Sequence, residues 1–158
     1  MKVETGRILG LALAAGIALA CVPGNYGVNF AVRPGALEDG TPAEPFSEED
    51  LELAKAVAAE VAEKFEMASI FDRYGDEFVH NGQRELALYE RASHGQSQIV
   101  FGVSVKEDMS ELLLGFQDKT SSMRNDENMD LRDELKWRLE KAFPDREIEF
   151  HSFKKTPF

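Results

Sequence analysis

Three consecutive segments of this 158-residue chain alternate apolar side chains with polar or small ones, which is the period of a half-buried β-strand. They cover residues 83–91, 99–105 and 112–117, and only a few residues connect each segment to the next. Connections this short favour an antiparallel meander. An Asn81-Gly82 pair joins residues 77–80 to the first segment, and it predicts a hairpin because both central residues of a type I′ turn need a positive φ.

Two helices are predicted around these strands. Ser47 is a favoured N-cap and three acidic residues follow it, so the first helix is expected over residues 48–67. The second is expected over residues 127–143, where Pro144 ends it. Residues 68–76, after the first helix, fit either a helix extension or a loop.

The strands predict one strongly apolar face and one mixed face, as in a sheet that carries helices on one side. A final strand is expected over residues 147–153, before a short tail at 154–158. The sequence therefore predicts a single small α+β domain over residues 46–153, with an antiparallel sheet and two helices packed on one face. The predicted order is α-β-β-β-β-α-β.

The N-terminus reads as an export signal rather than as part of this domain. Residues 8–20 form an uncharged apolar run of about 13 residues, which is too short to span a membrane as a helix. Pro23 and Gly24 follow it, and Ala18 and Ala20 are the small residues that a signal peptidase accepts. Residues 1–20 are therefore expected to be removed, which leaves 28 acidic and 16 basic residues and a net charge of −12.

Ala18-Leu19-Ala20-Cys21 resembles the lipobox of bacterial lipoproteins, and Cys21 is the only cysteine of the chain. The resemblance implies cleavage between Ala20 and Cys21, diacylglycerol on the Cys21 sulfur, and acyl chains such as palmitate that anchor the protein to a membrane. It also implies a periplasm-facing protein of the bacterial cell envelope. Val22, where an Asp would signal retention in the inner membrane, favours the outer membrane. The alternative is an ordinary signal peptide that leaves Cys21 as a free thiol.

Residues 21–45 contain many glycines and prolines and read as a flexible linker of about 25–30 Å. One part of the linker departs from this composition, because four apolar residues alternate with small or polar ones: Tyr26, Val28, Phe30 and Val32. This segment is either an edge strand or arm of its own domain, or a strand that is added to the sheet of a protein partner.

No catalytic, cofactor or metal site is predicted. The three histidines, His80, His94 and His151, have no zinc-ligand spacing, and a strongly negative chain disfavours nucleic-acid binding. Trp137 lies off the helical stripe of Leu131, Leu135 and Leu139, so it is expected on the outer face of the second helix. There it is either part of a protein interface or a residue covered by a loop or by the segment of residues 26–32.

These observations favour a non-enzymatic envelope lipoprotein that binds a protein partner through the 26–32 segment or the Trp137 face. The alternative is a small envelope hydrolase or ligand-binding domain with a pocket between sheet and helices. In that case, His80 or His94 beside a carboxylate would be the place of the chemistry.

Overall fold

The computed structural model describes residues 26–71, 78–80, 82–121 and 124–154. Its sheet follows the order β2-β4-β5-β6-β1-β7, with β3 paired to β4 beside β2, and every pairing is antiparallel. The strands are β1 (Tyr26–Arg33), β2 (Ala68–Ser69), β3 (Phe78–His80), β4 (Gln83–Ser93), β5 (Gln96–Lys106), β6 (Leu112–Asp118) and β7 (Glu147–Lys154).

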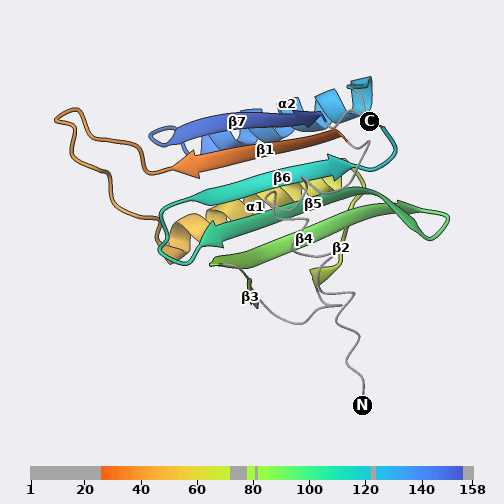
Figure 1. Ribbon diagram of the computed structural model, residues 1–158, viewed down its shortest axis with the longest axis horizontal. Helices are drawn as coiled ribbons and strands as arrows, with labels where there is room; N and C mark the ends of the chain where they lie inside the picture. The colour runs from red at the N-terminus through yellow and green to blue at the C-terminus, as the bar shows by residue number, and fades with distance from the viewer. Residues whose placement is uncertain (1–25, 72–77, 81, 122–123, 155–158) are drawn as a thin grey trace, which may run out of the picture.

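The two helices, α1 (Glu48–Lys64) and α2 (Asp126–Ala142), lie side by side on one face of the sheet (Figure 1). The predicted class, α+β with an antiparallel sheet and two helices on one face, is thereby confirmed. The predicted element order lacks two strands, β1 before the first helix and β2 directly after it. The second helix is displaced by one residue from its predicted range. The first ends at Lys64 rather than Met67, because Glu66 takes a φ of 55° and turns the chain toward β2. The ambiguous segment after α1 thus begins as a short strand.

The core forms between the helices and the apolar face of the sheet. Cross-strand neighbours stack in rows across β5, β6 and β1: the central row is Val103, Leu114 and Phe30. Each helix contributes one apolar stripe to this core, as the three- and four-residue spacing predicts. The buried stripe of α1 contains Leu51, Ala54, Ala58 and Val61, and that of α2 contains Leu131, Leu135 and Leu139.

Strand β1 corrects the expected domain boundary. It is neither linker nor edge strand: it pairs along its whole length with β7 on one side, and from Tyr26 to Val32 with β6 on the other. The folded domain therefore begins at Tyr26 and not at Phe46, and residues 34–45 are the connection from β1 to α1. The alternation of β1 predicts a strand, but nothing in a single segment tells which strands will flank it.

Two hairpins show how the meander is turned. Residue pairing from His80↔Gln83 outward confirms the predicted β3–β4 hairpin, although Asn81 lies outside the described residues. Between β4 and β5, His94 and Gly95 have φ values of 51° and 77°. Positive φ at both central residues matches the right-handed twist of the adjoining strands, as in a type I′ turn.

On the face of the sheet opposite the helices, the central side chains are small or polar. Gly115 of β6 lies between Gly102 of β5 and Asn29 of β1, and a Cβ at position 115 would approach Asn29 Oδ1 to 2.0 Å. On the same face Glu85 lies opposite Ser104, and both residues are buried. The strand alternation predicts a mixed composition here, but it does not reveal that polar groups are withdrawn from solvent.

Candidate functional site

Trp137 is exposed on the outer face of α2. Leu135 and Leu139 on either side of it are fully buried against the sheet, whereas 53% of Trp137 is exposed. The helical spacing predicts this contrast, since residues two apart point about 200° apart around a helix. Its ring is approached by the ammonium of Lys141, 5.2 Å from the ring centroid, and by the guanidinium of Arg138. Trp137 thus contacts two cations while about half of it stays exposed to solvent.

A hollow of about 240 Å³ lies beside Trp137, between the two helices. Leu53 of α1, which is 40% exposed, contributes a second apolar side chain to it. The complete lining is Leu53, Val57, Glu60, Trp137, Arg138, Lys141 and Ala142. Trp137 and Leu53 therefore belong to one surface, although 84 residues separate them in the sequence.

Ion pairs between the helices hold the walls of this hollow in place. Arg138 binds Glu60 of α1 and, through Nε at 2.6 Å, Glu134 of its own helix. Lys64 of α1 contacts Glu134 at 2.5 Å. Surface pairs contribute little to stability individually, but these three share Arg138 and Glu134 and form one network between the helices. The hollow is therefore bordered by a charged network that joins α1 to α2.

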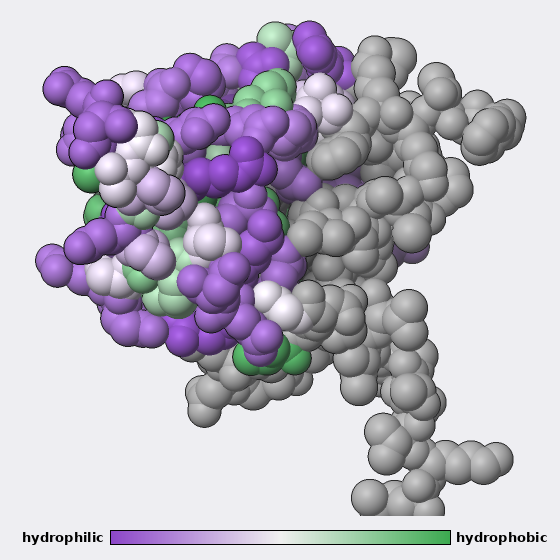
Figure 2. All heavy atoms as spheres, turned by 60° about the vertical axis from the view of Figure 1, so that its left-hand side comes forward, coloured by the Kyte–Doolittle hydropathy of each residue, from purple (hydrophilic) through white to green (hydrophobic). Residues whose placement is uncertain are grey.

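The helical layer is strongly acidic. The two helices contain twelve acidic and six basic residues, a net charge of −6. The end of the molecule that carries residues 34–45 is also mainly hydrophilic, with small, separate hydrophobic areas (Figure 2). The Trp137 hollow thus lies in a helical layer that is negative overall, although the charged residues that line the hollow itself are Glu60, Arg138 and Lys141.

The structure does not bring the predicted interface residues of the 26–32 segment to this surface. Tyr26, Val28, Phe30 and Val32 are fully buried in the core of their own domain. Their backbone is paired on both sides, so the hypothesis that they bind a partner is wrong for this fold. Ala20 and Cys21 lie outside the described residues. Within the described ranges, no helix is long and apolar enough to cross a membrane.

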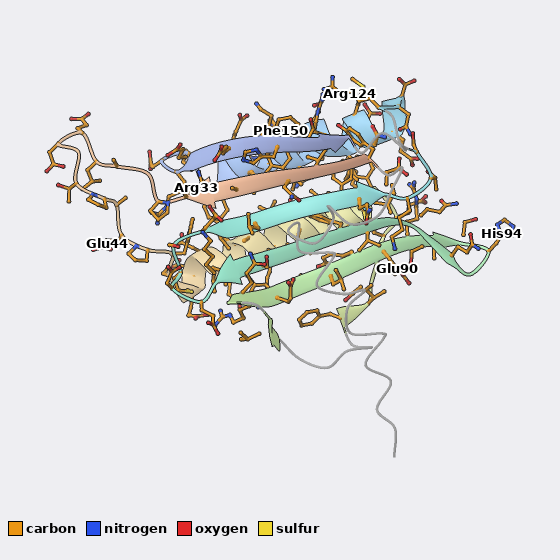
Figure 3. The ribbon with its side chains drawn as sticks, viewed as in Figure 1. Arg33, Glu44, Glu90, His94, Arg124 and Phe150 are labelled. Carbon is orange, nitrogen blue, oxygen red and sulfur yellow. The ribbon has the colours of Figure 1, made fainter. Side chains whose placement is uncertain are left out.

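The histidines lie at separate places. His94 is at the tip of the β4–β5 hairpin, where its Nδ1 is 2.9 Å from Ser93 Oγ (Figure 3). The side chain of His80 is outside the described part of the structure. The predicted space for a pocket between sheet and helices is filled by core side chains such as Phe30, Phe101 and Leu135. No group of three metal-ligating side chains occurs among the residues that the structure describes.

One charged network was not foreseen. Arg33 of β1 binds Glu149 of β7 and Glu111, the latter at 2.6 Å, and His151 Nε2 lies 3.1 Å from Glu149 Oε1. The hydrogen bond from Arg33 holds the pKa of the Glu149 carboxyl below its usual range, so this group is a carboxylate at neutral pH. These residues lie up to 118 positions apart in the chain, and the pairing of β1 with β7 on one side and with β6 on the other brings them together.

Glu85 is a second unforeseen group. It is 3% exposed, and burial raises the pKa of its carboxyl from 4.5 to about 8. Glutamate in an alternating strand normally marks the solvent face, so the sequence carries no signal for this burial.

Comparisons of the chain with protein-family models, with curated proteins and with solved structures returned no match. The fold and the surface therefore define a class only: a small α+β domain with an apolar hollow in an acidic helical layer.

Proposed function

We propose that this protein is a lipid-anchored, non-enzymatic protein of the bacterial cell envelope, and that its helical layer binds a protein partner. The observation that carries the partner proposal is the exposed Trp137, which shares a hollow between the two helices with Leu53. Tryptophan is strongly enriched among residues that dominate protein-binding energies, particularly where an apolar pocket is surrounded by polar groups.

Charge indicates which partner the surface fits. A layer with a net charge of −6 repels acidic proteins, nucleic acids and anionic lipid headgroups. The fitting partner presents an apolar side chain to the hollow and Lys or Arg residues to the acidic groups of the helices beyond Arg138 and Lys141. Its association should weaken as salt rises, because the surrounding charge pairs are exposed to solvent.

The proposed anchor holds the domain near the bilayer. Anchoring through the lipid on Cys21 is supported by the lipobox-like sequence. Because β1 begins at Tyr26, the chain between the anchor and the sheet spans at most about 18 Å, less than the linker expected from the sequence. The Tyr26 end of the sheet then faces the membrane, and the 34–45 connection faces away from it. Val22 supports the outer membrane as the destination.

The anchor is tested by Cys21→Ser. Growth with a labelled fatty acid should label the unchanged chain and leave the variant unlabelled, and the variant should accumulate as the longer precursor. A variant that is processed normally, together with an unchanged chain that takes up no label, would establish the ordinary signal-peptide alternative.

The partner surface is tested by placing a photoreactive phenylalanine analogue at position 137 or 53 in cells. Both positions should cross-link the same protein, through a peptide rich in Lys and Arg. Leu37, which is exposed on the β1–α1 connection, is the matched control and should not give that product. Equal cross-linking at 37, or attachment to an acidic peptide, would contradict the proposed surface.

A further inference from the structure

The two edges of the sheet are protected very differently. Along the edge of β4, the short strands β2 and β3 cover parts of the strand, and two register shifts, near Glu85 and near Arg91, interrupt its pairing with β5. Short edge strands and bulges are devices that prevent a sheet from pairing with another chain. This edge of the sheet is therefore poorly suited to strand addition.

Strand β7 forms the opposite edge and has neither device. Its eight residues pair with β1 in one unbroken register, from Arg33↔Glu147 to Tyr26↔Lys154. It contains no proline, and no other strand in the described part of the chain pairs with its outer side. Alternate backbone N–H and C=O groups along this outer side are therefore available for a further strand.

We propose that β7 pairs antiparallel with β7 of a second copy of this chain, across a two-fold axis at Phe150. In an antiparallel pair, residues directly opposite each other have their side chains on the same face of the sheet. Because side chains alternate between the two faces along a strand, β7 can pair with its own copy only where the two opposed residue numbers are both odd or both even. The register centred on Phe150 places Glu149 of each copy opposite His151 of the other copy. It also places the two Phe150 rings against each other.

The two neighbouring registers are less favourable. Centring the axis on Glu149 places two carboxylates directly opposite, which is destabilising. Centring it on His151 places Phe150 opposite Ser152, so the aromatic pair is lost. Charge and shape along β7 thus select the Phe150 register, and they select a second copy as the occupant of this edge.

The position of Phe150 explains what pairing would add. Its ring packs 5.3 Å from that of buried Phe30, measured between ring centroids, yet Phe150 itself is 40% exposed. Figure 3 shows it on the outermost strand of the sheet. In the paired arrangement the aromatic row continues from Phe30 through both Phe150 rings to the second Phe30. Aromatic cross-strand pairs of this kind stabilise sheets.

The test uses the full chain extracted in detergent. Phe150→Cys should form an intermolecular disulfide on mild oxidation, because its two copies meet at the axis. Ser152→Cys, exposed on the same face of the same strand, should not, because its two copies are offset by about 13 Å along the strands. The unsubstituted chain measures any background from Cys21. Sedimentation velocity should show a dimer, and Phe150→Lys should weaken it at least tenfold.

Val79→Lys is the matched control for the loss of the dimer, since Val79 is 56% exposed at the other edge of the sheet. It should leave dimerisation unchanged. Thermal unfolding of both Lys variants shows whether either fails to fold. His151→Glu should also weaken the dimer, since it places two carboxylates opposite each other.

A chain that stays monomeric at 100 µM, or disulfides that form equally at 150 and 152, would overturn the proposal. A different protein linked at position 150 would assign this edge to that protein and equally overturn self-pairing. The Trp137 surface is not involved in any of these outcomes.

Discussion

Replacing Glu85 by glutamine should prevent much of the loss of stability that the parent protein undergoes as pH rises from 5 to 8. The folded state holds this carboxyl buried with a pKa of about 8, against an ordinary value of 4.5. Between these two values the folded state binds a proton that the unfolded chain releases. The free energy of unfolding therefore falls as pH rises, by up to about 1.4 kcal/mol per pH unit.

Integrated from pH 5 to pH 8, this one group removes about 3.5 kcal/mol of stability, and the loss is nearly complete at pH 9. Glu85→Gln keeps a neutral side chain of similar shape but has no proton to lose. The difference in unfolding free energy between variant and parent should therefore shift by about 3.5 kcal/mol in favour of the variant over that range. Any constant cost of fitting the amide cancels in this comparison.

Urea unfolding followed by circular dichroism at pH 5, 6, 7 and 8 measures the effect. Glu38→Gln, which removes a carboxylate from the exposed β1–α1 connection, is the control for the change in net charge. It should follow the pH dependence of the parent. If Glu85→Gln also follows the parent, the pKa of Glu85 in the folded state is not raised, and the prediction of a buried, neutral carboxyl is wrong.

Two further pairs of substitutions test the packing. Gly115→Ala should destabilise the protein by at least about 2 kcal/mol, because the added Cβ meets Asn29 Oδ1 at 2.0 Å. Gly27→Ala, whose added Cβ has its nearest contact at 3.6 Å, should destabilise it clearly less. Equal losses of stability in urea unfolding would refute the close approach at Gly115. Leu135→Ala should cost about 2–5 kcal/mol, while Trp137→Ala should cost less than about 1 kcal/mol, and a reversed order would show that Trp137 is a core residue.

The candidate surface was only partly accessible to prediction. That Trp137 is exposed follows from its angle to the Leu131–Leu135–Leu139 stripe, which is a property of one helix. That it shares a hollow with Leu53 depends on how α1 and α2 are placed on the sheet, and no local pattern contains this information. The same holds for the Arg33–Glu149–His151 network, which exists because β1 and β7 are neighbours.

The helices, the meander and the hairpin turns were determined by the sequence itself. N-caps, apolar spacing and the residues of tight turns act over a few positions, so their effect can be read locally. The tertiary structure alone decided that β1 lies between β6 and β7 and pairs with both, that Glu85 is buried, and that β7 is an edge strand. Each of these depends on which distant segment supplies the neighbour, and hydrogen bonding and burial select that neighbour only when the whole chain has folded.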